Sequence, residues 1–575
     1  MRSIDWLVLL AFFGYTLWDG MRHRKQTEGI SDLLLAGRSM PWWAAGLSVM
    51  ATQASAITFI GTTGQAYMHD MRFLQVYLGL PIAMIILSVT LVPFFNKYKP
   101  YTAYEALEQR FGLRVRLTTS FMFLLSRAVG LGITIAAPAY VLALILDIPL
   151  MWTNLIIGAG ATIYTMFGGI SGVIRTDMKQ MVLMLLGMGL CFYFIWAKLP
   201  DHLSTAEVLN LAGASGKLKT IDLRFDLGEK YNLWSGLIAG LFLMLSYFGT
   251  DQSQVQRYLT ARSLGDARMS LMLSAILKVP MQFFILLLGV YLYIFYVFEP
   301  HPLLFSPQPS KVQCQDQTPP MEAEFQFWQA SRKAAALAWS DGSLAEAEAR
   351  ARYQTADEAL YKLRKQELIR QESLSGTSRN DTNYVFPHFM LTQLPIGVLG
   401  LIVAAILAAA LSSIDSMLNS LAATTVVDWY RRLRPGPKDD AFYLRLTRWS
   451  TAGWGVLATL SAVAFGETES IIELTNQLGS YFYGPMLGVF VLIWCKWATP
   501  NGTLWGLGLG LLGVMTAGSW YHGCMPGEYT FLFPLGRIPE GFEPVLEYLW
   551  LNPLGTILTV GTAWFWRKRK SRGVE

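Results

Sequence analysis

Long apolar stretches separated by short polar segments follow one another along most of the 575-residue chain. They lie at residues 6–18, 42–67, 73–95, 115–145, 150–167, 173–197, 233–256, 269–298, 387–428, 442–465, 471–496, 502–521 and 546–566. Most of them approach or exceed the ~20 residues that a helix needs to cross a bilayer. The pattern therefore predicts an all-α polytopic membrane protein with about 13 transmembrane helices.

The amino-acid composition agrees with a membrane protein. Hydrophobic residues make up 53% of the chain and charged residues only 15%, which leaves too little polar material to cover a soluble globule of this length. The net charge of +6 is modest, and its basic residues lie mainly in short loops, so the sequence does not indicate binding to nucleic acid. The four cysteines lack CxxC spacing and predict neither a zinc site nor a redox pair.

The charges that flank the apolar stretches predict the orientation in the membrane. Residues 6–18 are followed by a basic run and by no small-residue cleavage pattern, which indicates a retained helix with its N-terminus outside. An odd number of spans then places the basic run at 567–570 in the cytoplasm. The same rule assigns three basic loops to the cytoplasm: 97–116, 257–268 and 430–438. We expect an integral protein of the cell (inner) membrane with its N-terminus outside and a cytoplasmic C-terminus.

One polar segment, residues 305–384, is far longer than the other connections. It is rich in Ala, Glu, Lys and Arg on either side of a turn at Asp341 and Gly342, which predicts a helical hairpin outside the membrane. Its functional interpretation is a lid or a partner-docking module, and the alternative is a tolerated loop insertion. Cys314 and Cys524 would both face the oxidising side, where a disulfide between them is an open alternative.

The stretch at residues 404–430 carries the first candidate chemistry. Its small and polar residues recur at helical spacing: Ala409, Ser412, Ser413 and Ser416. They therefore share one face of a helix. Asp415 lies beside this face, and a carboxylate at membrane depth is costly enough to mark a function unless it has a structural partner.

Two other apolar stretches are weakened by small and polar residues. Residues 42–67 contain Gly46, Ser48, Thr52, Gln53, Ser55 and Thr58. Residues 233–251, five spans later, contain Gly236, Gly240, Ser246, Gly249 and Thr250. Two such helices in corresponding positions of two five-helix halves indicate an inverted-repeat transporter with a midplane site. In the alternative, these small residues only permit close helix packing.

Four segments together resemble the signature segments of the sodium/solute symporter family. They are AYEALEQRFG (103–112), GGISGVIRTDMKQ (168–180), TDQSQVQRYLTARS (250–263) and SSIDSMLNSLAATTVVDWY (412–430). The resemblance implies a LeuT-type core of two inverted five-helix repeats with extra N- and C-terminal helices. The insertion at 305–384 is absent from the better-known members.

The resemblance divides the chain into five parts. They are an N-terminal helix and cytoplasmic loop (1–36), the first repeat (37–200), the second repeat (201–304 and 385–498), the extracytoplasmic helical insertion (305–384), and two C-terminal helices with a cytoplasmic tail (499–575).

The resemblance also implies a common sodium site, which joins backbone carbonyls of the broken second span to oxygens of residues 404–430. By motif, its residues are Ala51, Ala54, Ala409, Ser412 and Ser413. Physical chemistry supports such a site, because sodium is a hard cation that prefers oxygen ligands and an unwound helix frees carbonyls.

Some members bind another sodium ion beside the aspartate of the TD pair. Here that site corresponds to Asp177, Ser412, Asp415 and Ser416. Asp415 stands where those members carry a hydroxyl, and two neighbouring carboxylates repel unless a cation or a proton lies between them. We hypothesise that Asp177 and Asp415 share a second coupling cation, so that the chain binds a second sodium ion besides the common one. In the alternative, Asp415 pairs with a basic side chain such as Arg175 or Arg127, or stays protonated.

Arg127 is the other intramembrane charge, and it has two interpretations. In the functional one, it is a guanidinium clamp for a substrate carboxylate. In the structural one, it pairs with Asp177 or Asp415, or its side chain reaches the inner surface. The other candidate substrate contacts are Gln53, Thr58, Gln75, Tyr247, Phe248, Asn476 and Gln477. Amides and hydroxyls at a midplane cavity suit a polar organic solute.

These features predict a sodium-coupled secondary active symporter that imports a small polar organic solute, namely a sugar, a sugar acid or a carboxylate, by alternating access. We expect the chain not to be an enzyme and its partners to be sodium, the solute and the lipid bilayer. The alternative is a proton-coupled protein or a sodium-gated channel or sensor on the same fold. The sequence does not name the solute, because fold does not select among the solutes of such a scaffold.

Overall fold

The computed structural model describes residues 2–22, 29–306, 319–375, 381–436, 438–464, 471–520 and 544–567. In these parts of the chain the secondary structure is helical, apart from an isolated bridge between Met40 and Ala261. Cys314 and Cys524, whose pairing the sequence left open, lie outside the described residues.

The helices of the N-terminal part follow one another with short connections. They are α1 (Ser3–Arg22), α2 (Ile30–Leu35), η2 (Ala36–Arg38), α3 (Trp42–Gln53), α4 (Ala56–Met68), η3 (Arg72–Tyr77), α5 (Leu80–Val89), α6 (Leu91–Tyr98), α7 (Glu105–Phe111), α8 (Leu113–Leu146), α9 (Leu150–Trp196) and α10 (Thr205–Ala214).

The C-terminal part contains the long insertion. Its helices are η4 (Ser235–Ala239), α11 (Gly240–Thr250), α12 (Gln252–Leu259), α13 (Leu264–Phe298), α15 (Pro319–Ser340), α16 (Glu346–Ser375), η5 (Thr382–Tyr384), α17 (Val385–Gln393), α18 (Val398–Thr424), η6 (Thr425–Tyr430), α19 (Arg431–Leu433), α20 (Asp440–Ala464), α21 (Ile471–Val491), η7 (Leu492–Trp494), α22 (Pro500–Gly518), η8 (Tyr548–Trp550) and α23 (Leu551–Phe565).

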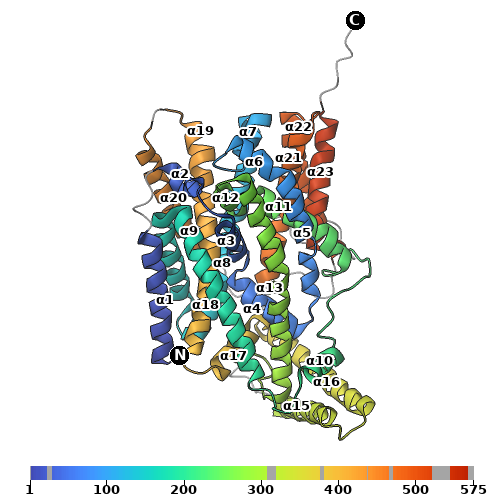
Figure 1. Cartoon of the computed structure of the whole chain (residues 1–575). Helices are drawn as coiled ribbons and strands as arrows, with labels where there is room; N and C mark the ends of the chain where they lie inside the picture. Colours follow the sequence, from blue (N-terminus) through green and yellow to red (C-terminus); the bar gives the residue numbers. More distant parts are fainter. Residues whose placement is uncertain are drawn as a thin grey trace.

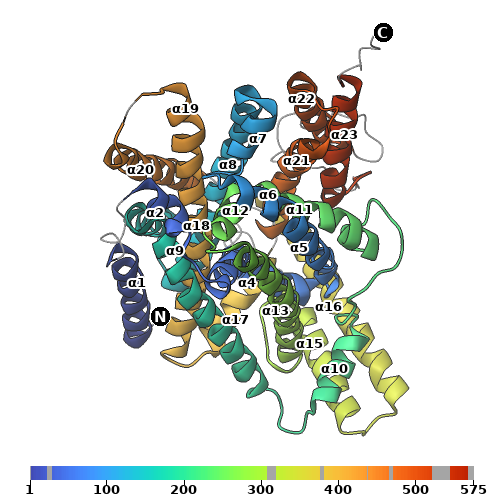
Figure 2. The same cartoon turned by 45° about the horizontal axis from the view of Figure 1, so that its top comes forward.

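The long helices form one bundle (Figures 1 and 2). The pair α15 and α16, together with α10, lies at the end of the bundle near the N-terminus, and α7 lies at the opposite end (Figure 1). Within the described residues, 6 helices are long and apolar enough to cross a membrane, or 7 if the bent pair α3 and α4 counts as one span. The count of 13 spans stays a prediction.

The second apolar stretch is broken in its middle. Helix α3 ends at Gln53, Ala54 leaves the helical region (φ −87°, ψ 65°), and α4 starts at Ala56 after a bend of 55°. Ser55 starts α4 as its N-cap, because its hydroxyl accepts the Thr58 N–H at 3.3 Å. The polar content of this stretch therefore produces a break, and near the end of α3 the Thr52 carbonyl accepts the Ser413 hydroxyl.

A second break separates α11 from α12 at Asp251. Its backbone is extended (φ −82°, ψ 116°), and its carboxylate accepts the Ser253 N–H at 2.9 Å, which caps α12. Gly236 serves close packing instead, since a Cβ there would collide with the carbonyl of Gln75. In the stretch 233–251, then, an aspartate makes the break and a glycine makes the helix contact.

The sequence separates residues 150–167 from 173–197, and the structure has a single helix, α9, with a kink between them. Gly169 has φ 56° and ψ −167°, a conformation that favours glycine. A Cβ there would also lie 2.8 Å from the carbonyl oxygen of Leu33. Close contact with α2 and the positive φ therefore fix the kink at this position.

Helix α18 lies in the centre of the bundle and packs against α8, α9, α20 and α1. Almost all its side chains are buried. Helix α1 contacts the N-terminal end of α18, where the carboxylate of Asp5 accepts the N–H groups of Gly397 and Gly400 at 2.7 and 3.0 Å. A carboxylate at a helix N-terminus satisfies free amide groups and interacts well with the helix dipole, so Asp5 fixes α1 to α18.

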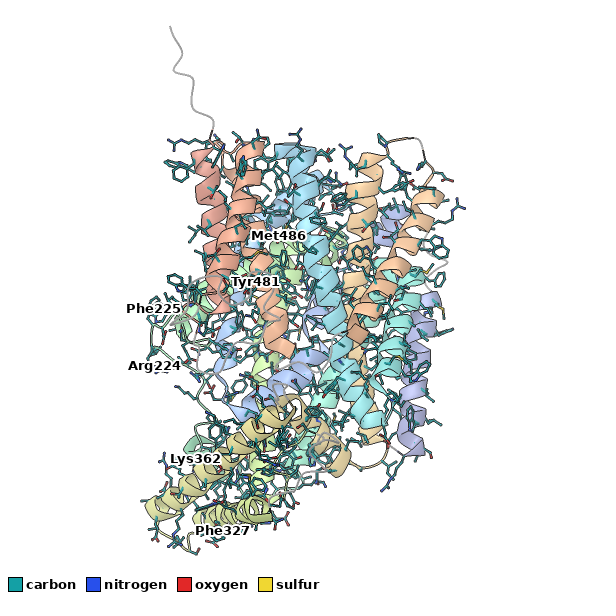
Figure 3. All side chains as sticks on the ribbon, turned by 180° about the vertical axis from the view of Figure 1, so that it is seen from behind. Arg224, Phe225, Phe327, Lys362, Tyr481 and Met486 are labelled. Carbon is teal, nitrogen blue, oxygen red and sulfur yellow. The ribbon has the colours of Figure 1, made fainter. Side chains whose placement is uncertain are left out.

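The insertion is a helical hairpin, α15 and α16, that packs on the end of α13. Arg332 of α15 pairs with Asp357 of α16 at 3.0 Å and donates to the Tyr296 carbonyl at 2.9 Å. Phe327 and Lys362 mark the part that projects from the bundle (Figure 3). On which side of the membrane it lies stays a prediction.

Replacing Asp5 by Ala should destabilise the protein by about 1 kcal/mol, because two N–H groups at the start of α18 lose their acceptor. The apparent Tm of the detergent-solubilised protein should fall. Asp5→Asn is the matched control and should lose less, since both N–H groups donate to one carboxylate oxygen and the amide oxygen of Asn can take its place. Equal Tm values for Asp5→Ala and the wild type would contradict the proposed cap.

Candidate functional site

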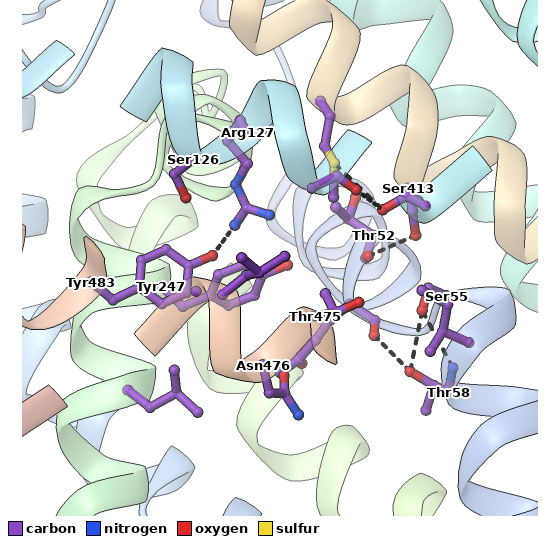
Figure 4. Close-up of a pocket in the computed structure, with 18 of the residues that line it drawn as sticks. Thr52, Ser55, Thr58, Ser126, Arg127, Tyr247, Ser413, Thr475, Asn476 and Tyr483 are labelled. Atoms are coloured by element: carbon purple, nitrogen blue, oxygen red, sulfur yellow. Dashed lines mark hydrogen bonds between the residues drawn. The ribbon is translucent and has the colours of Figure 1, made fainter. Parts of the chain in front are cut away.

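A cavity of about 130 Å³ lies where both broken spans meet α8, α18 and α21 (Figure 4). Its polar lining residues are Thr52, Gln53, Ser55, Thr58, Tyr77, Ser126, Arg127, Thr134, Tyr247, Ser413, Thr475, Asn476 and Tyr483. Most polar side chains around it are hydroxyls and amides, and three tyrosine rings form part of the wall. This lining suits a polar organic molecule.

The predicted common sodium site lies at the break between α3 and α4. The Ser413 hydroxyl is 3.1 Å from the Thr52 carbonyl oxygen and 3.3 Å from that of Ala409. Ala51 lies in the last turn of α3 and Ala54 is its C-cap, and both are buried. The break and the small-residue face of α18 therefore lie together, with hydroxyl and carbonyl oxygens between them.

Asp177 of α9 lies next to this face and is fully buried. It accepts hydrogen bonds from the hydroxyls of Ser412 at 2.6 Å and Ser48 at 2.5 Å. The guanidinium of Arg257 is 3.3 Å away, and it also donates to the hydroxyls of Ser48, at 2.9 Å, and of Ser416. Arg257 thus reaches two of the four residues assigned to the second cation site.

Asp415 has different partners from those expected. Its carboxylate accepts the Tyr164 hydroxyl at 2.5 Å and lies 3.1 Å from the Ser416 hydroxyl. Of the basic partners that the sequence suggested, Arg127 pairs with Asp251 instead. Arg257 of α12 reaches the cluster through Asp177 and Ser416. The sequence did not predict this, because residues 257–268 were assigned to a cytoplasmic loop, whereas α12 holds Arg257 in the bundle, where it is 0% exposed.

The cluster of Asp177, Asp415 and Arg257 has more negative than positive groups. Two ionised carboxylates, Asp177 and Asp415, and one guanidinium, Arg257, leave one net negative charge in a buried place. A buried net charge is costly unless it is paired, so the cluster attracts one more cation or a proton.

Arg127 pairs with Asp251, not with Asp177 or Asp415. Its Nε donates to Asp251 at 2.5 Å, and its Nη2 donates to Asp251 and to the Tyr483 hydroxyl. The guanidinium lies 5.4 and 5.5 Å from the ring centroids of Tyr247 and Tyr483. It also lines the cavity, so Arg127 is both an ion-pair partner and a candidate substrate contact (Figure 4).

The structure divides the other candidate substrate contacts into two groups. Gln53, Thr58, Tyr247 and Asn476 line the cavity. Phe248 and Gln477 are not among the lining residues. Gln75 is also outside the lining: its amide donates to the Tyr231 carbonyl and accepts the Asp222 N–H, both at 3.1 Å.

Several residues of the site were missed by the sequence analysis. Asp251 had a usable signal, since an aspartate followed by Ser253 between two apolar segments is a typical helix N-cap. Tyr164 and Tyr483 had none, because a tyrosine in an apolar span looks like any other core residue. Lys278 of α13 is a further buried charge, and its ammonium lies 5.1 Å from the ring centroid of Tyr77.

Comparisons with known proteins identify the family of this chain. The profile of the sodium:solute symporter family matches residues 33–321 and 366–510. The sodium/sialic acid symporter NanT of Aliivibrio fischeri is 28% identical over 544 residues, which cover 93% of this chain and 91% of that protein. The sodium/glucose cotransporter of Vibrio parahaemolyticus is 26% identical over 507 residues, 86% of this chain and 80% of that protein.

A solved structure has the same fold. It is the substrate-bound outward-open state of a Na⁺-coupled sialic acid symporter, with a TM-score of 0.73 and 24% sequence identity over 98% of this chain and 97% of that one. The chain belongs to the sodium:solute symporter family. It is therefore an integral membrane transporter, not an enzyme, and its relatives support sodium-coupled solute symport.

Arg257→Gln should destabilise the protein by about 3–5 kcal/mol, because it leaves Asp177 and Asp415 without their buried counter-charge. Adding Asp177→Asn restores the wild-type net charge of the cluster, so the double variant should regain more than half of the lost Tm. Thermal unfolding in detergent without sodium measures both. A double variant no more stable than Arg257→Gln would contradict this account of the charges.

Proposed function

We propose that this protein is a sodium-coupled symporter that imports a small polar organic solute by alternating access. The observation that carries the proposal is that the cavity adjoins the predicted common sodium site. Ser413, a predicted sodium ligand, lines the cavity, and its hydroxyl contacts the carbonyl of Thr52, which also lines it. A cation there and a solute in the cavity would therefore bind to the same pieces of α3 and α18.

The coupling follows from this shared wall. Sodium entering from outside binds oxygens of Ala51, Ala54, Ala409, Ser412 and Ser413 and holds the break of α3 and α4 against α18. This favours an outward-open state that accepts the solute, and release of sodium into the cytoplasm favours the opposite state. Sodium drives the cycle only through its different affinity for these states.

The second cation is proposed for the cluster of Asp177 and Asp415. Support comes from its net negative charge after pairing with Arg257, and from the hydroxyls of Ser412 and Ser416, which add oxygen ligands at the same place. A sodium ion there would raise the stoichiometry above one.

Relatives and charge distribution suggest the remaining details. The named relatives transport sialic acid and glucose, which places sugars, sugar acids and other carboxylates in the range of proposed solutes. Arg127 lines the cavity and is the proposed contact for the polar groups of such a solute. We further propose 13 spans in the cell (inner) membrane, with the N-terminus and the hairpin outside and the C-terminus in the cytoplasm.

Purified protein in liposomes should accumulate a radiolabelled solute above its outside concentration when an inward sodium gradient is imposed. D-glucose and N-acetylneuraminate are the solutes tested.

Ser413→Ala should raise the sodium concentration for half-maximal thermal stabilisation at least about tenfold, because the loss of one ligand typically costs over 1 kcal/mol. Potassium chloride at equal ionic strength gives the baseline.

The matched control for this substitution is Ser420→Ala on the same helix. Ser420 is also buried and also donates to the preceding turn, at 2.8 Å to the Met417 carbonyl, but does not line the cavity. It should leave the sodium dependence unchanged. A channel would equilibrate the solute without accumulating it, and equal sodium affinity of Ser413→Ala and the wild type would remove the proposed common site.

Asp415→Ser should lower the Hill coefficient of sodium-dependent stabilisation from about two to about one, because the Hill coefficient is limited by the number of coupled sites. The substitution removes one carboxylate and leaves a hydroxyl. The same titration, with sodium replaced by potassium, checks that the effect is specific. An unchanged coefficient would defeat the second-cation proposal and leave Asp415 as a structural partner of Tyr164.

A further inference from the structure

We propose that the cavity selects an uncharged, hydroxyl-bearing solute no larger than a monosaccharide, and that Asp251 is the residue that determines this selectivity. The inference rests on the proposed symport and narrows its solute. It differs from the broader proposal in excluding carboxylates, although Arg127 lines the cavity.

The cavity wall carries no net charge. Among the residues that line it, Arg127 is the charged one. Its Nε and Nη2 are both engaged by Asp251, a residue that is fully buried and does not line the cavity. The pair carries no net charge, so the guanidinium offers the solute a hydrogen-bond donor without a free positive charge. Lys278 contacts Tyr77 but is outside the lining.

Asp251 is held in place by Ser253 as well as by Arg127. Its other oxygen accepts the Ser253 N–H at 2.9 Å and the Ser253 hydroxyl at 2.6 Å, and these bonds cap α12. The Tyr483 hydroxyl lies 3.2 Å from the oxygen that faces Arg127. A solute carboxylate would therefore compete with an internal carboxylate that is already positioned and that the helix start keeps there.

The amide oxygen of Gln53 is a hydrogen-bond acceptor that lacks a donor. Gln53 lines the cavity, and its Oε1 is buried without a hydrogen-bond partner, while its Nε2 has only a 3.9 Å contact with the Met244 sulfur. A hydroxyl satisfies such an amide because it both donates and accepts. The solute therefore needs a hydroxyl that donates to this oxygen. A sugar and its acid both meet this requirement, so the Arg127–Asp251 pair is what separates them.

The size of the cavity suits a single ring. Its volume is about 130 Å³, close to the roughly 150 Å³ of an apolar protein cavity that binds one benzene molecule. The rings of Tyr77, Tyr247 and Tyr483 in its wall would lie against the apolar faces of such a ring, and the hydroxyls around it would point to Gln53, Thr58 and Asn476.

The test compares matched pairs of solutes that differ by one carboxylate: D-glucose with D-glucuronate, and D-galactose with D-galacturonate. For the wild type in sodium, we expect a neutral member to raise the Tm and its acid to bind at least about tenfold more weakly. Binding of an acid in preference to its neutral partner, or no stabilisation by either neutral sugar, would overturn the inference.

Asp251→Asn tests the selectivity residue. It frees the charge of Arg127, so the affinity for the acids should rise at least about tenfold relative to the neutral sugars. Asp226→Asn is the control, since the Asp226 side chain accepts the Gly228 N–H in a loop and does not line the cavity. If Asp251→Asn fails to fold, the pair Arg127→Gln and Asp251→Asn together removes both charges and should keep the neutral preference; a gain for the acids in that double variant would contradict the role of Asp251.

The two levels of proposal fail in different ways. If the acids are accumulated in a sodium gradient and the neutral sugars are not, sodium-coupled symport stands and the uncharged solute is wrong. If a neutral sugar binds equally with and without sodium, and is never accumulated against its gradient, the proposed symport itself is wrong.

Discussion

The burial of Asp177, Asp415 and Arg257 at one point is the constraint on which the rest of the structure depends. All three are inaccessible to solvent, and they come from α9, α18 and α12. Charges in such a place remain only where each finds partners, and here the partners are hydroxyls of α3 and α18 and the Tyr164 hydroxyl. The positions of four core helices are therefore tied to the same few contacts.

The two breaks in the chain connect this cluster to the cavity. At the first, the end of α3 presents a carbonyl to Ser413, one position from Ser412, whose hydroxyl binds Asp177. At the second, Asp251 caps α12 and holds Arg127 at the cavity wall, and the same short helix carries Arg257 into the cluster. A rearrangement of α12 would therefore change the cavity wall and the cation cluster together, which is the physical requirement for coupling two bound species.

Local rules predicted the parts of this arrangement that depend on local sequence. Small and polar residues predicted a weakened span at 42–67, and the structure breaks it where Ser55 caps α4. The recurrence of small residues from Ala409 to Ser416 predicted a polar helix face. Residues 150–167 and 173–197 were predicted as two spans, and the structure has one helix with a kink between them, because Gly169 adopts a positive φ. The predicted hairpin likewise follows from helix propensity on either side of Gly342.

Contacts between distant segments could not be predicted in this way. Arg257 looked like a loop arginine of the cytoplasmic face, because basic residues near span ends usually set topology, and only the packing of α12 shows that it is buried. The pairing of Arg127 with Asp251 joins residues 124 positions apart. The proposed role of this pair in selectivity depends on which nitrogen atoms of Arg127 remain free for the solute. The spacing of residues along the sequence cannot predict this.

The central claim is that the buried cluster needs one cation besides that of the common site. Equilibrium dialysis of the purified wild-type protein with radioactive sodium counts the ions directly, with no solute and no variant. The account predicts about two sodium ions per chain at saturation, because one net negative charge remains after Arg257 is paired. A saturating value of about one, unchanged when the pH is raised, would contradict it.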